Sequence, residues 1–90
     1  MKSLAEFKRR IQLGVKVRTK YANGMELPVR EVSIKQSNSF AFRTQIEDKS
    51  FQDSWIEYPK ASNIEFPDNN TATIFWDTKD RKECLTYIFI

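Results

Sequence analysis

The chain has no histidine and only one cysteine, Cys84, among its 90 residues. The absence of histidine excludes Ser-His-Asp and Cys-His catalytic arrangements and zinc sites with histidine ligands. A lone cysteine can form neither an internal disulfide nor a paired-cysteine metal site. No apolar run approaches the ~20 residues that a membrane-spanning helix needs, and residues 1–10 lack the apolar segment of a secretion signal. We therefore expect a cytoplasmic protein that makes no membrane contact, and a free thiol fits reducing conditions.

Groups that could carry catalysis or hold a ligand are also scarce. Adjacent acids such as Glu47 and Asp48 occur in polar segments, where such pairs are more often solvated turn residues than an acid–base couple. Residues 68–70 offer oxygen atoms but lack the spaced acids and the closing glutamate of a calcium loop. The two glycines are isolated, so there is no glycine-rich phosphate loop. The sequence thus predicts a protein that is not an enzyme, with no catalytic residues, no metal site and no cofactor.

The size and composition fit a single domain, 1–90, with an apolar fraction of 40%. The net charge of +3 is unevenly distributed along the chain. Residues 1–43 carry ten Lys or Arg and three acids, whereas residues 44–90 carry five and nine. The basic half could attract phosphate or an acidic protein. Alternatively, the two halves neutralise each other once the chain has folded.

The first element predicted by the sequence is a helix over residues 4–12. Ser3 and Glu6 have the spacing of a capping box, in which the serine hydroxyl accepts a hydrogen bond from the Glu6 amide. Phe7 and Ile11 follow at helical spacing and would share one apolar stripe. Basic residues gather near the end of the segment, where positive charge suits the helix dipole.

After the helix the apolar period changes to two, which is typical of strands. Asn23 and Gly24 form a strong hairpin signal. A tight turn there would pair Lys16 with Glu31, a favourable cross-strand combination. A longer loop over 22–28 is the alternative connection. Pro28 cannot donate a ladder hydrogen bond, so its strand is expected either to be bulged or to lie at a sheet edge.

A second hairpin is predicted to bring Phe40 and Phe42 onto the inward face. A two-residue turn between its strands would pair Ile34 with Ala41 and direct both phenylalanines outward. A three-residue loop over 36–38 would keep them inward, and the apolar alternation favours that loop.

The remaining chain predicts more strands separated by polar segments. We expect a loop over 45–53, a strand over 54–58, a single helical turn over 59–62, and strands over 63–66, 72–76 and 84–90. The fold class is therefore mainly β (α+β): an N-terminal helix and then an antiparallel meander over 15–90 of about five to seven strands. The short helical turn between strands favours a small SH3-like barrel. A strongly curved sheet packed on one helix is the alternative.

Two segments of the sequence resemble a known group of proteins. They are SNSFAF, Ser37 to Phe42, and SWIEYPKAS, Ser54 to Ser62. Both resemble small uncharacterised proteins of Gram-positive phages and prophages, and the segments LAEFK and GVKV near the start are similar to them as well. The resemblance implies a phage or prophage gene expressed in the bacterial host cytoplasm. It implies no activity and no catalytic residues.

Basic and aromatic residues suggest nucleic-acid binding as one class of function. Small barrels bind single strands through a basic groove with aromatic side chains on which bases stack. The candidate residues for a face that binds nucleic acid or an acidic partner are Arg9, Arg10, Lys16, Arg18, Lys20, Lys35, Arg43, Trp55, Tyr58 and Lys60. Trp55 and Tyr58 fall on opposite faces of their strand, so we expect at least one to be partly exposed, although both also fit core packing.

The terminal strand suggests protein binding, which is the leading hypothesis. This strand carries apolar residues on both faces, so it is either central in the sheet or covered by something. At a sheet edge it would pair with another chain through Thr86, Ile88 and Ile90. The sequence therefore predicts a non-enzymatic accessory protein that binds a host protein or a second copy of itself, with nucleic-acid binding as the alternative.

Overall fold

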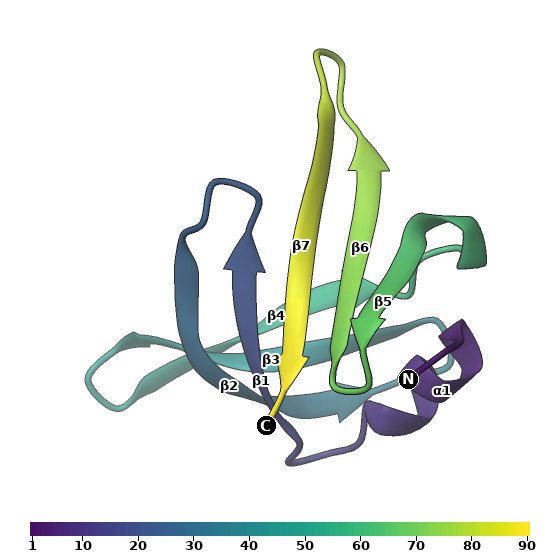
Figure 1. Ribbon diagram of the computed structural model, residues 1–90. Helices are drawn as coiled ribbons and strands as arrows, with labels where there is room; N and C mark the ends of the chain where they lie inside the picture. The colour runs from purple at the N-terminus through teal and green to yellow at the C-terminus, as the bar shows by residue number, and fades with distance from the viewer.

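The computed structural model describes residues 1–90 and contains one short α-helix and a single antiparallel sheet of seven strands (Figure 1). The elements are α1 (Leu4–Arg10), β1 (Lys16–Tyr21), β2 (Glu26–Lys35), β3 (Ser39–Glu47), β4 (Ser50–Glu57), the 3-10 helix η1 (Ala61–Asn63), β5 (Ile64–Asp68), β6 (Thr71–Asp77) and β7 (Lys82–Phe89). The strand order is β4-β3-β2-β1-β7-β6-β5. The predicted mainly β class is confirmed. The sheet does not close into a barrel, because β4 and β5 are its two ends, so the strongly curved sheet is the correct alternative.

Helix α1 begins as the sequence predicts and ends earlier. The Ser3 hydroxyl accepts a hydrogen bond from the Glu6 amide at 3.2 Å. The helix stops at Arg10 rather than at residue 12, because the backbone of Ile11 is already extended (φ −77°, ψ 97°). Phe7 is completely buried beneath the helix.

The β1–β2 hairpin has the predicted pairing at its base and a different turn at its tip. Lys16 lies opposite Glu31, as expected. Nearer the turn the register shifts by one residue, and the loop ends at Gly24 with φ 90°, a conformation that suits glycine. The extra residue lies in β2 between Leu27 and Arg30, the segment that contains Pro28, and β2 is an interior strand. Of the two expectations for this proline, the bulge is therefore correct.

The β2–β3 hairpin corrects the predicted three-residue loop over 36–38. The turn has two residues, and Ile34 lies opposite Ala41. A register shift between Val32 and Ile34 then restores the pairing of Val32 with Phe42. This β-bulge absorbs one residue, so a two-residue turn and two inward phenylalanines coexist.

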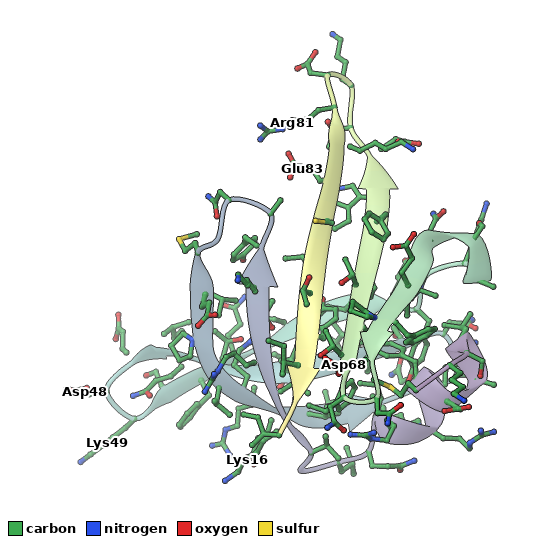
Figure 2. All side chains as sticks on the ribbon, in the orientation of Figure 1. Lys16, Asp48, Lys49, Asp68, Arg81 and Glu83 are labelled. Atoms are coloured by element: carbon green, nitrogen blue, oxygen red, sulfur yellow. The ribbon has the colours of Figure 1, made fainter.

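Residues 45–53 form a hairpin rather than the predicted loop. Strand β3 runs to Glu47 and β4 begins at Ser50, so the two strands project as an arm whose tip carries Asp48 and Lys49 (Figure 2). The segment is polar because much of this arm is exposed to solvent. The predicted helical turn is present as η1, shifted slightly toward the C-terminus.

The core lies between the two halves of the curved sheet. In Figure 1, β3 and β4 cross behind β1, β7 and β6, which places the inward side of β3 against the inward side of β7. Phe42 packs on Tyr87 with ring centroids 5.7 Å apart. Phe7 closes the core from the helix and contacts four aromatic rings, those of Phe40, Tyr58, Tyr87 and Phe89. No helix of this fold combines the length and apolar character required to span a bilayer.

Candidate functional site

Strand β4 lies at one end of the sheet and has one edge without a strand partner. Strand β4 pairs only with β3, along an almost unbroken register. The Tyr58 amide donates to the Asn38 carbonyl at 3.1 Å. Since bonded positions alternate along an antiparallel ladder, the even-numbered residues of β4 bond to β3 and the odd-numbered ones direct their amide and carbonyl groups away from it. Those outward-directed residues are Phe51, Asp53, Trp55 and Glu57.

The two ends of the sheet differ in how well they are protected. Strand β5 is short, contains Pro67 and has a register shift in its pairing with β6. Prolines and bulges are common devices that prevent further strand pairing at an edge. Strand β4 contains no proline, glycine or lysine, and its only register shift lies beside the turn. The β4 edge is therefore the one that can accept another strand.

Two aromatic side chains lie on the outward face of β4. Trp55 is 50% exposed and Phe51 is 49% exposed. Trp55 lies opposite Ala41, which is completely buried even though it belongs to the outer face of the sheet. The guanidinium of Arg43 lies 3.9 Å from the centroid of the Phe51 ring. The edge thus combines unpaired main-chain groups with apolar area, as protein-binding surfaces do.

A row of charged residues with alternating sign leads to this edge. Lys16 lies opposite Glu31, Glu31 opposite Arg43, and Arg43 opposite Asp53. Direct cross-strand partners share one face of the sheet, so the four residues form a line across β1 to β4. Asp53 also accepts a hydrogen bond from the Ser33 hydroxyl at 2.8 Å. The row ends on Asp53, with no further strand beyond it.

Phe51 and Asp53 are not among the residues predicted from the sequence, because the polar composition of 45–53 predicts a loop. The signal was present as a period of two that alternates aromatic and acidic residues from residue 51 to residue 57. Trp55 was included among the candidates, and its exposure fulfils the expectation that one of the strand's aromatic residues is accessible. Tyr58 is half-buried and packs on Phe40, with ring centroids 5.2 Å apart.

The cationic residues named as candidates are distributed over three regions. Near α1, Arg10 bonds to Asn69 and Asn70, and Lys35 donates to the carbonyl of Lys8 at 2.8 Å. Arg9 and Lys60 are exposed, on α1 and just before η1. On β1, the alternating residues Lys16, Arg18 and Lys20 are exposed on the outer face. Arg43 lies on β3, separated from Lys16 by Glu31.

Strand β7 is central in the sheet. It pairs with β1 on one side and with β6 on the other. Of the proposed interface residues, Ile88 therefore lies between Arg18 and Thr71, and Thr86 lies between Lys20 and Thr73. Ile90 follows the strand and is exposed. The alternative in which this strand forms an edge is wrong, and its two apolar faces are explained by its interior position.

A hollow of about 590 Å³ opens where β2 and β3 diverge beyond the Glu31–Arg43 pair. Arg30 lies on the wall of this hollow. It is not among the residues predicted from the sequence, although its position two residues before the inward Val32 places it on the same face. Its guanidinium donates to Thr19 at 2.9 Å and to Thr44 at 3.4 Å, and covers the Phe42 ring at 4.5 Å. Burial lowers the pKa of Arg30 from its usual value. Arg30 thus links β1, β2 and β3 beside the aromatic core.

The buried phenol of Tyr87 predicts a loss of stability at high pH. Burial raises its pKa well above the ordinary value, an effect that the nearby charge of Arg30 partly offsets. The folded chain therefore keeps the phenol protonated where the unfolded chain, with a pKa of about 10, releases the proton. This contribution to stability is complete below about pH 10 and is lost as the pH rises further, by about 1.4 kcal/mol per pH unit.

Urea unfolding at about pH 9 and about pH 11 tests this expectation. The parent chain should lose about 1 kcal/mol more between the two pH values than the variant Tyr87→Phe, which cannot ionise. Tyr58 is retained in both proteins, so the difference isolates Tyr87. An identical pH dependence in the two proteins would contradict the argument.

No protein-family model, no curated protein and no solved structure matches this chain. The function proposed below therefore depends on the chain's own geometry.

Proposed function

We propose that this chain is a non-enzymatic binding protein that pairs an extended segment of a partner protein with the free edge of β4. The observation that supports this proposal is the contrast between the two sheet ends, with β5 protected and β4 open along its length. In such strand addition, main-chain hydrogen bonds provide affinity and alternate side chains provide specificity. The resemblance to phage and prophage proteins favours a bacterial host protein as the partner.

The side chains of the edge fit the same role. Trp is among the residue types that contribute most to binding energy in protein interfaces. Trp55 and Phe51 are both half-exposed and lie beside the unpaired backbone of β4. A partner strand would cover both rings while satisfying the main-chain groups at Asp53 and Trp55. Together these contacts can support specific binding without any catalytic group.

A pair of substitutions at Asp53 tests the proposal. Asp53→Pro removes an outward amide and places a ring where the partner strand would lie, whereas Asp53→Ala keeps the amide and removes only the carboxylate. In an affinity capture from a Gram-positive lysate, we expect Asp53→Pro to weaken binding of the recovered partner by more than about tenfold. Asp53→Ala should weaken it by no more than about fivefold.

Two results would contradict this function. One is equal recovery of the same partner by the parent chain and by Asp53→Pro. The other is recovery of no partner, combined with a monomeric mass by light scattering.

A further inference from the structure

We propose that the strand accepted by β4 belongs to a different protein, not to a second copy of this chain, and that it alternates Lys or Arg with apolar residues on its outward face. This inference rests on the proposed function and specifies the partner for the same edge. It follows from the order of charges across the sheet and from the composition of β4.

The row of charged residues across β1 to β4 indicates which charge an added strand must carry. From β1 to β4 the sign alternates through Lys16, Glu31, Arg43 and Asp53. Directly opposed residues of opposite charge stabilise strand pairing, and like charges weaken it. A strand added beyond β4 continues this pattern only if it places a cation opposite Asp53. Because no ion pair of the chain involves Asp53, its carboxylate keeps its charge available for such a partner.

The outward face of β4 indicates the full side-chain pattern of a complementary strand. Along this face, Phe51, Asp53, Trp55 and Glu57 alternate aromatic and acidic side chains. Glu57 lies opposite Ser39, so it also lacks a cationic neighbour on β3. A complementary antiparallel strand therefore carries basic residues opposite the two acids and apolar residues opposite the two aromatic rings.

Self-pairing cannot satisfy these requirements. Strand β4 contains no Lys or Arg, so no register of two antiparallel β4 strands brings a cation of the strand opposite Asp53. The nearest cation is Lys49 in the turn, and placing it opposite Asp53 would reduce the overlap within β4 to residues 50–52. The register centred on Asp53, which overlaps residues 50–56 of the two strands, would instead set the two copies of this carboxylate against each other.

Peptide binding tests the inference directly. The probes are two blocked heptapeptides, Lys-Thr-Val-Thr-Lys-Thr-Val and its counterpart with Glu in place of both Lys. They are titrated into the isotope-labelled protein while the amide signals of β4 are followed. The parent chain should bind the Lys peptide about tenfold more tightly than the Glu peptide, with the largest shifts at Phe51, Asp53 and Trp55.

Charge reversal on the protein identifies the residues responsible. In Asp53→Lys the preference for the Lys peptide should fall to about one, and adding Glu57→Lys should reverse it. Glu65→Lys is the matched control, because it makes the same change of net charge on β5, at the other end of the sheet. The control should keep the preference of the parent chain, since a pairing effect is local.

Failure of the inference alone gives a different result from failure of the proposed function. Equal binding of both peptides at β4 would overturn the inference and leave strand addition intact. Absence of any binding at β4 would overturn both. A dimer of the parent chain in light scattering that Asp53→Pro converts to a monomer would show that a second copy occupies the edge, which also overturns the inference.

Discussion

Replacing Phe7 with alanine is expected to lower the free energy of unfolding by about 4 kcal/mol, the upper part of the range for large aromatic truncations. Phe7 is fully buried and its ring contacts rings of β3, β7 and the segment after β4. The substitution leaves a cavity where the helix joins the two halves of the sheet, and few side chains are free to fill it.

Urea denaturation followed by tryptophan fluorescence measures this loss. The matched control is Leu13→Ala, because Leu13 is 66% exposed and its truncation should cost less than about 0.5 kcal/mol. A loss below about 1.5 kcal/mol for Phe7→Ala would mean that the helix contributes little to the core.

A second large effect is expected from proline placed at two neighbouring positions of β4. Ser54 pairs with Phe42 in the bonded position of the ladder, so Ser54→Pro should lower the free energy of unfolding by about 3 kcal/mol. It also removes the hydroxyl that lies 2.8 Å from Thr44. Asp53→Pro removes an amide that bonds to nothing, and its cost should stay near about 1 kcal/mol.

The same unfolding measurement compares the two variants. Similar losses at both positions would show that the alternation of bonded and free amides along β4 has been assigned wrongly. A small loss for Asp53→Pro also matters for the binding experiment, because only a folded variant can report on the edge.

Local features of the sequence predicted much of the secondary structure. Ser3 and Glu6 fixed the start of the helix, and the period of two identified most strands. The predicted three-residue turn of the β2–β3 hairpin was wrong, because a bulge near Ser33 shifts the inward–outward alternation within β2 by one residue. Periodicity counts residues and cannot detect an inserted one.

The edge of the sheet could not be predicted from the same signals. Strand order depends on which distant segments meet, and apolar residues on both faces of β7 fitted a covered edge as well as a central position. The pairing of β7 with both β1 and β6 decides between them. With β7 in the interior, β4 is an end strand. The alternation of Phe51 with Asp53 then lies along a free sheet edge, whereas the polar composition of 45–53 had predicted only a loop.

The central position of β7 also has a consequence for how the chain is synthesised. Strands β1 to β4 form one meander and β5 to β7 another, and each can assemble from neighbouring hairpins. The only strand pairing between the two meanders is that of β1 with β7, in which Val17 lies opposite Phe89. Contacts this distant in sequence form late and slow folding. On the ribosome, the first meander must therefore wait with its inner face uncovered until β7 emerges, and the β4 edge is exposed to other chains throughout that interval.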